Sequence, residues 1–181
     1  MRNKKLVFSS LAIGTAVAAY LFKNRTNKKI EAEAITNFDI NKYLGLWYEI
    51  ARIDTFWEKN KSNVTARYLR NYDDTIEVIN RGYDNKKKIW NRSKGIAKQL
   101  NKGVGKFKLS FLEPVYSSYN VIAIEQDYTY ALVAGKNTDY LWILSRSKTI
   151  PADIRQQFIL KAEELGYNTN KLIWTIHDNK K

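Results

Sequence analysis

Residues 37–52 read NFDINKYLGLWYEIAR, and this stretch decides the fold. Gly45 stands two residues before Trp47, and an alternation of side chains typical of a β-strand follows. Trp47, Glu49 and Ala51 share one face of this predicted strand, because side chains point to opposite faces in turn. The chain thus places its largest aromatic at the start of its first strand. The alternation alone does not show which of the two faces is the inside.

Composition favours strands and excludes several kinds of site. The chain has 181 residues, enough for one domain with a core. It contains 12 Tyr and 5 Trp but only 2 Pro, a balance that suits strands better than helices. It has no cysteine, which excludes disulfides, thiolate metal sites, thiol nucleophiles and cysteine-linked lipid anchors. Its one histidine, His177, cannot form a histidine cluster, so we expect no metal and no cofactor.

The formal net charge of +13 suggests nucleic-acid binding as one alternative function. Residues 1–29 hold seven of the 31 basic residues and none of the 18 acidic ones, so the rest has 24 against 18, or +6. Its lysines are scattered, except that residues 86–88 are three lysines that we interpret as a hairpin tip. We therefore expect no nucleic-acid partner. DNA binding that weakens steeply with salt would contradict this expectation.

Residues 1–29 are predicted to be a signal or membrane-anchor segment, separate from the fold. Basic residues lie on both sides of an apolar or small run at residues 6–22. Ala16-Val17-Ala18 offers the small residues that a signal peptidase needs, whereas the charges after the run favour an uncleaved anchor, so both alternatives stay open. Residues 30–36 are then a linker, and residues 37–178 the main domain.

Period-two alternation recurs after Gly45 and predicts eight strands in series. Turn signals such as Asp84-Asn85 and Ser117-Ser118 separate them. After the strand that starts at Gly45, they are predicted at residues 63–69, 75–83, 88–100, 103–112, 119–125, 128–134 and 140–146.

A helix with one apolar stripe is predicted between Pro151 and Gly166, followed by a strand at residues 171–176. A meander of eight strands has exposed edges unless it closes. The predicted fold is therefore all-β: an eight-stranded antiparallel up-and-down β-barrel with one C-terminal α-helix packed outside and a short final strand.

Three short motifs resemble those of the lipocalin family. Residues 45–47 are similar to its first signature, G-x-W, and Asp127-Tyr128 falls where the second has D-Y. Arg146 ends the predicted eighth strand, like the arginine of the third signature. The strings at residues 37–52, 119–124 and 139–146 look specifically like the bacterial lipocalins related to apolipoprotein D.

The resemblance implies a structural role for the residues of the barrel floor. Trp47 would plug one end of the barrel, with Arg146 over its ring, and Gly45 would let the incoming backbone approach closely. Glu49 is assigned to this floor as well, paired with an Arg or Tyr, in preference to a contact with the ligand.

The resemblance also implies a lipid-binding protein of the bacterial cell envelope and not an enzyme. The inside faces mix large apolar side chains with small ones, which leaves room for a fatty acid or a lysophospholipid, stored or transported for membrane maintenance. The predicted ligand-binding residues are Ala51, Ala66, Tyr68, Val78, Asn80, Ser93, Leu109, Phe111, Tyr140 and Trp142.

Two points stay open beside this interpretation. One alternative is an enzyme that uses Glu49 as an acid or base, although no second positioned group is evident. The other concerns location: bacterial relatives usually carry a lipid on a cysteine, which this chain lacks, and one alternative is that the run at residues 6–22 stays uncleaved and replaces that anchor. We expect an exported, periplasm-facing and membrane-associated protein, at the outer membrane by resemblance or at the inner membrane by an uncleaved anchor. A homodimer is possible.

Overall fold

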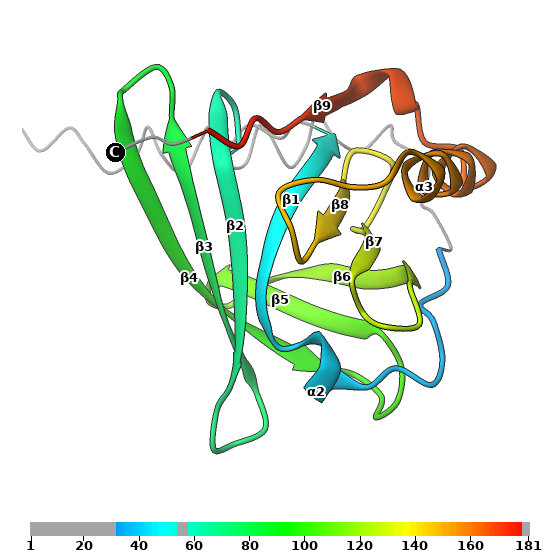
Figure 1. Cartoon of the computed structure of the whole chain (residues 1–181). Coiled ribbons are helices and arrows are strands. Elements are labelled where there is room, and N and C mark those ends of the chain that lie inside the picture. The colour runs from blue at the N-terminus through cyan, green and yellow to red at the C-terminus, as the bar shows by residue number, and fades with distance from the viewer. Residues whose placement is uncertain (1–31, 54–57, 179–181) are drawn as a thin grey trace, which may run out of the picture.

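The computed structural model describes residues 32–53 and 58–178, and its main feature is a ring of strands (Figure 1). The elements in chain order are α2 (Ile40–Tyr43), β1 (Gly45–Ile53), β2 (Lys61–Arg70), β3 (Ile76–Asp84), β4 (Ile89–Gln99), β5 (Lys106–Leu112), β6 (Val115–Ile124), β7 (Tyr130–Ala134), β8 (Leu141–Ser145), α3 (Ala152–Glu164), a 3-10 turn η2 (Thr169–Lys171) and β9 (Leu172–Trp174).

The sheet closes on itself. Each strand from β2 to β7 pairs with the next in antiparallel order, β8 pairs with β1, and β1 pairs with β2. The predicted eight-stranded up-and-down barrel is therefore confirmed, with β9 as one extra strand beside β1. Closure pairs the backbone groups that an open edge would leave exposed.

The two ends of the barrel differ. Successive turns of an up-and-down barrel lie at opposite ends, and α2 directly precedes β1. The end with α2, which we call the floor, therefore also holds the β2–β3, β4–β5 and β6–β7 turns (Figure 1). The opposite end, which we call the mouth, holds the β3–β4, β5–β6 and β7–β8 turns.

The C-terminal segment completes the wall toward the mouth. β1 pairs with β2 only over Gly45–Tyr48, so the strands part above this point. The backbone N–H of Thr175 donates to the carbonyl of Ile50 at 2.9 Å, and the N–H of Asn63 donates to the carbonyl of Ile176 at 2.8 Å. The end of the chain therefore lies between β1 and β2 and satisfies their backbone groups.

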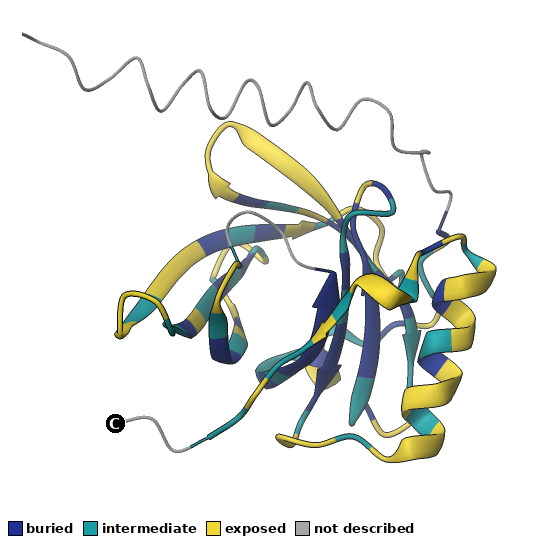
Figure 2. Cartoon of the chain, turned by 90° about the horizontal axis from the view of Figure 1, so that it is seen from above, coloured by how far each residue is buried: buried dark blue, intermediate teal, exposed yellow. Residues whose placement is uncertain are grey.

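Two apolar clusters lie on the two sides of the sheet. The inner cluster fills the floor half of the barrel, and the outer cluster lies between the barrel and α3. Figures 1 and 2 show α3 outside the ring of strands. Phe158 and Ala162 on α3 are buried in the outer cluster. The outer cluster also contains Ala32, Ile50, Ala51, Ile53, Ile122, Leu132, Ala134, Leu141, Ile143 and Tyr167.

A β-bulge in β1 places Ala51 outside the barrel. Glu49 pairs with Leu144, but Ala51 pairs with Ile143, so two steps along β1 match one step along β8. The extra residue, Ile50, reverses the alternation, as bulges do. Ala51 therefore lies in the outer cluster, and its predicted inward, ligand-facing placement is wrong.

Two predicted boundaries also need correction. Ser117-Ser118 is not a turn: Ser117 pairs with Leu109 and Ser118 with Lys108, so both lie within β6. The predicted linker at residues 30–36 is not free in its described part. The N–H of Ile35 donates to the carbonyl of Val121 at 2.9 Å, and Thr36 forms a bridge with Val104.

The helix boundaries agree with the prediction. α3 has Pro151 as its N-cap residue, and Gly166 follows its C-cap residue with a φ of 83°. Among the described residues, no helix is long and apolar enough to cross a membrane. The predicted signal or anchor at residues 1–29 lies outside the described part of the chain.

The outer cluster should carry much of the stability. Phe158 is 3% exposed beneath α3, so we expect Phe158→Ala to lower the free energy of unfolding by about 3–5 kcal/mol. Leu160→Ala, at a half-exposed position of the same helix, should change it by less than about 0.5 kcal/mol. Urea denaturation followed by tryptophan fluorescence measures both. Equal effects would show that α3 does not depend on this contact.

Candidate functional site

The floor is held by Arg146 and Trp47. The guanidinium of Arg146 lies 3.8 Å from the centre of the Trp47 ring, a cation–π contact. The same guanidinium donates to three backbone carbonyls near α2: that of Leu46 at 2.8 Å, that of Lys42 at 2.6 Å and that of Tyr43 at 3.2 Å. The indole of Trp47 donates to the carbonyl of Tyr43 at 2.8 Å. One cation therefore ties β8 to the chain entering β1.

Gly45 is needed for its backbone conformation. Its φ is 95°, in the region that glycine adopts at little cost. A Cβ at this position would lie 3.5 Å from Nη1 of Arg146, an ordinary contact distance. The backbone angle, and not the close approach that the resemblance implied, is therefore what requires glycine here.

Above the floor, three tyrosine hydroxyls meet inside the barrel. The hydroxyl of Tyr119 lies 2.6 Å from that of Tyr43 and 2.7 Å from that of Tyr68. The three side chains come from the segment before β1, from β2 and from β6, so they join three parts of the wall. Burial raises the pKa of Tyr68 to about 12 and the pKa values of Tyr43 and Tyr119 well above their usual range. The cluster is therefore neutral at ordinary pH.

A small cavity of about 10 Å³ lies at these tyrosines. This is close to the space that a single water molecule needs. Apart from the tyrosines the lining is apolar. The complete lining is Ile40, Tyr43, Tyr68, Ile76, Ala97, Phe107, Leu109 and Tyr119.

The inner face becomes more exposed toward the mouth. Val78 is buried, whereas Ser93 is exposed, although both lie on the inner face of neighbouring strands: Val78 pairs with Gly95, two residues along β4 from Ser93. Ala66, Leu109 and Trp142 pack against the inner cluster but are only partly buried. The half of the inner face nearer the mouth, which we call the open half, is thus the more accessible one.

A polar acceptor stands in this open half. Asn80 pairs with Ala66 and Ser93 and shares their inner face. Its Oδ1 atom is buried and has no hydrogen-bond partner. Such an atom costs free energy unless a donor reaches it, which a ligand hydroxyl or a water can supply.

Phe111 and Tyr140 lie nearer the mouth. Phe111 is 42% exposed, and its ring lies against Gly95, where a Cβ would come within 2.8 Å of it. Tyr140 directly precedes β8, and its ring lies 6.2 Å from that of Trp142. Both predicted ligand-binding residues are therefore beside the opening and not deep in the barrel.

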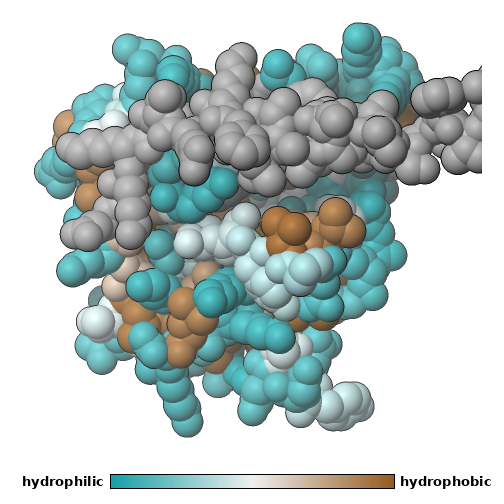
Figure 3. Space-filling view, turned by 180° about the vertical axis from the view of Figure 1, so that it is seen from behind, coloured by the Kyte–Doolittle hydropathy of each residue, from teal (hydrophilic) through white to brown (hydrophobic). Residues whose placement is uncertain are grey.

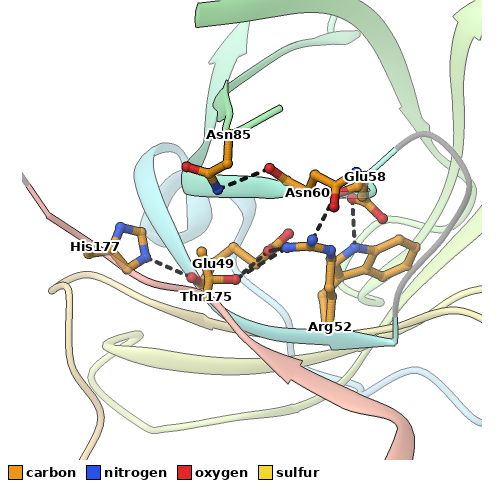
Figure 4. Close-up of polar contacts among 8 residues, drawn as sticks. Glu49, Arg52, Glu58, Asn60, Asn85, Thr175 and His177 are labelled. Carbon is orange, nitrogen blue, oxygen red and sulfur yellow. Dashed lines mark hydrogen bonds and ion pairs between the residues drawn. The ribbon is translucent and has the colours of Figure 1, made fainter. Parts of the chain in front are cut away.

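Glu49 is bound in the wall and not in the floor (Figure 4). Its Oε1 atom accepts from Nη1 of Arg52 and from Oγ1 of Thr175, both at 2.6 Å. Its backbone carbonyl lies 2.8 Å from Nε2 of His177. Glu49 and Arg52 are 3% and 1% exposed. Glu49 was predicted to pair with an Arg or Tyr of the floor. Its partner is Arg52 of β1, which the bulge turns inward opposite Trp142.

Arg52 extends this network toward the mouth. Its Nη2 atom donates to the carbonyl of Glu58 at 2.7 Å, and the indole of Trp142 donates to Oε1 of Glu58 at 3.1 Å. Because its charge is already compensated by Glu49, Arg52 is a weak candidate for binding an anionic head group.

Nine of the ten residues predicted to contact ligand lie on the inner face or beside the opening, and Ala51 does not. Sequence reasoning missed Tyr43, Tyr119 and Arg52. Tyr43 lies just before a predicted strand and Tyr119 begins another, but their hydroxyls meet only in the folded barrel. Arg52 was missed because regular alternation places it on the outer face, whereas the bulge turns it inward. Within residues 32–53 and 58–178, no group of three or more His, Asp or Glu side chains is placed to hold a metal ion.

Comparison with known proteins agrees with this geometry. The family model for the lipocalin-like domain matches residues 38–177. The chain is a lipocalin. It is 44% identical over 141 residues to the outer membrane lipoprotein Blc of Citrobacter freundii, covering 77% of this chain and 80% of that protein. It is 34% identical over 126 residues to apolipoprotein D of Mus musculus, covering 65% of each.

A solved structure supports the fold independently of close sequence similarity. Insecticyanin from the tobacco hornworm Manduca sexta superposes with a TM-score of 0.69 at 18% identity, covering 84% of this lipocalin and 88% of that chain. At this identity the match concerns the fold alone. The resemblance drawn from G-x-W, D-Y and the final arginine is therefore confirmed.

The floor contacts of the lipocalin should depend on the shape of arginine. Arg146→Lys removes the stacked plane and most of the donors to the carbonyls, so we expect a loss of about 2 kcal/mol or more. Arg155→Lys is the matched control, because the Arg155 guanidinium lies 3.6 Å from the Trp174 ring but on an exposed side chain. Its loss should stay below about 1 kcal/mol. Similar losses in urea denaturation would contradict the special role of the floor.

The tyrosine cluster should make stability fall at high pH. An unfolded tyrosine loses its proton near the ordinary pKa of 10.0, whereas Tyr68 in the folded lipocalin keeps its proton to a pKa of about 12. Between these values the folded state binds more protons, so stability decreases as pH rises, by up to about 1.4 kcal/mol per pH unit for each such group. Tyr68→Phe should make this fall shallower. Tyr72→Phe, at an exposed turn, should keep the parent slope in urea denaturation series from pH 9 upward.

Proposed function

We propose that this lipocalin binds a fatty acid or a lysophospholipid inside its barrel and stores or transports it in the cell envelope. The observation that carries the proposal is the gradient along the inner face. It is buried and apolar at the tyrosine cluster, partly accessible at Ala66, Leu109 and Trp142, and exposed at Ser93.

The shape of the interior suggests how the ligand lies. The deep cavity of about 10 Å³ is too small for an alkyl chain, so the chain would end above the tyrosine hydroxyls. It would lie against Ala66, Leu109 and Trp142, where each buried methylene contributes about 0.8 kcal/mol. The polar end would then lie toward the mouth, where Asn80 offers an unpartnered acceptor. A hydroxyl, as on the glycerol of a lysophospholipid, fits this acceptor better than a carboxylate does.

We propose no enzymatic role for Glu49. Its carboxylate already accepts from Arg52 and Thr175, and it serves to hold the C-terminal segment against β1. A general acid or base must reach a substrate proton, and a carboxylate held by a buried cation is poorly suited to that.

The location of this lipocalin is also a proposal. Its relatives include proteins named outer membrane lipoprotein in Citrobacter freundii, Vibrio cholerae and Escherichia coli. This chain has no cysteine to carry a lipid, so we propose that residues 1–29 supply the membrane attachment in its place. The domain would then face the periplasm.

Filling the open half of the barrel tests the binding site. Ala66→Trp places a large ring on the inner face, so we expect binding of a fluorescent fatty acid probe to weaken by about tenfold or more. Thr65→Trp, the next residue on the outer face of the same strand, should leave binding unchanged. Displacement of the probe by a lysophospholipid should distinguish the two lipid classes.

Two results would overturn the proposal. The first is a parent protein that binds neither lipid at micromolar concentration. The second is equal weakening by the inner and outer tryptophans, since this would place the probe on the surface and not in the barrel. Circular dichroism of each variant separates lost binding from lost folding.

A further inference from the structure

The β5–β6 hairpin exposes apolar side chains at its tip that the barrel does not need. Leu112 is 74% exposed and Val115 is 55% exposed, and the two pair across the turn at Glu113-Pro114. Phe111 and Tyr116 beside them are 42% and 37% exposed. All residues from 111 to 118 are exposed, and Figure 2 shows a hairpin exposed along both strands that stands out from the barrel.

This tip lies at the mouth. The β5–β6 turn shares its end of the barrel with the β3–β4 turn, because alternate turns of the meander lie at the same end. Ile89, at the mouth end of β4, is also 51% exposed. The face seen from behind is otherwise mainly hydrophilic, with apolar groups in small separate areas (Figure 3). Exposed apolar side chains beside a ligand entrance need a partner of apolar character.

Basic residues also lie on β4 and at the β3–β4 turn of the mouth end. Lys86, Lys87 and Lys88 are all exposed at the β3–β4 turn, where the carboxylate of Asp84 accepts from the N–H groups of Lys86 and Lys87 at 3.0 and 2.9 Å. These contacts hold the turn and leave the ammonium groups directed to solvent. Lys98 lies 5.7 Å from the Tyr116 ring, and Arg92 is exposed on β4.

The acidic group of the tip and one on β3 are both engaged. Glu113 lies in the turn itself, and its Oε1 atom accepts from the hydroxyl of Tyr116 at 2.8 Å. Glu77, on the outer face of β3, is paired with Lys94. Neither carboxylate therefore neutralises the lysines of the β3–β4 turn.

We propose that the mouth of this lipocalin docks on an anionic phospholipid bilayer, with Leu112 and Val115 inserted among the acyl chains and Lys86, Lys87 and Lys88 on the lipid phosphates. Apolar insertion and lysine–phosphate attraction together are what bind peripheral proteins to anionic membranes. A second copy of the chain fits this face poorly, because it would bring the same cations together.

The remainder of the chain is long enough to permit this orientation. Nine residues, 23–31, separate the apolar run at residues 6–22 from the first described residue. Extended, they span up to roughly 30 Å. The proposed N-terminal anchor and the hairpin can therefore reach one bilayer. The mouth then faces the lipid, and a ligand would pass between bilayer and barrel without crossing water.

Single labels in the full-length chain test this docking, because the chain has no native cysteine. Leu112→Cys and Tyr72→Cys are each labelled with the fluorophore NBD and reconstituted in vesicles that contain a lipid-attached quencher. Tyr72 is the control, since it is exposed at the β2–β3 turn of the floor end. In vesicles of equal parts phosphatidylcholine and phosphatidylglycerol, we expect the label at position 112 to be quenched several-fold more than the label at position 72. In phosphatidylcholine alone, or at high salt, the difference should shrink.

A separate variant tests the contribution of the three lysines at the β3–β4 turn. Replacing Lys86, Lys87 and Lys88 with Gln should lower the quenching at position 112 in the anionic vesicles toward the level in phosphatidylcholine. Equal quenching at positions 112 and 72 would overturn the proposal, as would parent-like quenching in the triple variant. Energy transfer between copies labelled at position 112 in vesicle-free buffer would also overturn it, in favour of a second copy. No cavity ligand is added, so the result does not depend on whether the barrel binds lipid.

Discussion

The contact between the guanidinium of Arg146 and the ring of Trp47 is the interaction on which the closed end depends. A barrel that is open at both ends would let water reach every inward side chain. Here one planar cation covers the indole and binds the carbonyls of Leu46, Lys42 and Tyr43, so it satisfies the backbone at the point where the chain enters β1. With water excluded there, the aromatic side chains above the floor can pack, and the tyrosine hydroxyls find partners only in one another.

The bulge in β1 divides the barrel into two chemical zones. Below it, the inner face of β1 presents Trp47 to an aromatic layer. Above it, the same face presents Arg52, which binds Glu49 and the loop at Glu58. A regular strand would have turned Arg52 outward into the apolar contact with α3, where its charge would be costly. One inserted residue therefore serves both the ion pair inside and the apolar contact outside.

The sequence predicted what depends on period and motif. Phe107 and Leu109 alternate with lysines, and this pattern identified the inner face of β5 correctly. The bulge left no such trace, because Ala51 is small and apolar enough for either face. The tyrosine cluster depends on hydroxyls separated by 76 and 51 residues, and only the strand register brings them together. The sequence predicted β6 too short, because exposed strands have no buried face to impose alternation. Ser117-Ser118 was therefore interpreted as a turn.

The position of the C-terminal segment has a consequence for how the barrel folds. The wall between β1 and β2 is completed only by residues 175–178, through backbone contacts with Ile50 and Asn63. The hydrogen bonds of β1 are therefore complete only when residues far from it in the sequence are in place. Contacts this distant in sequence form late. A chain without residues 175–178 would lack the backbone contacts that close this seam, so the wall between β1 and β2 would stay incomplete.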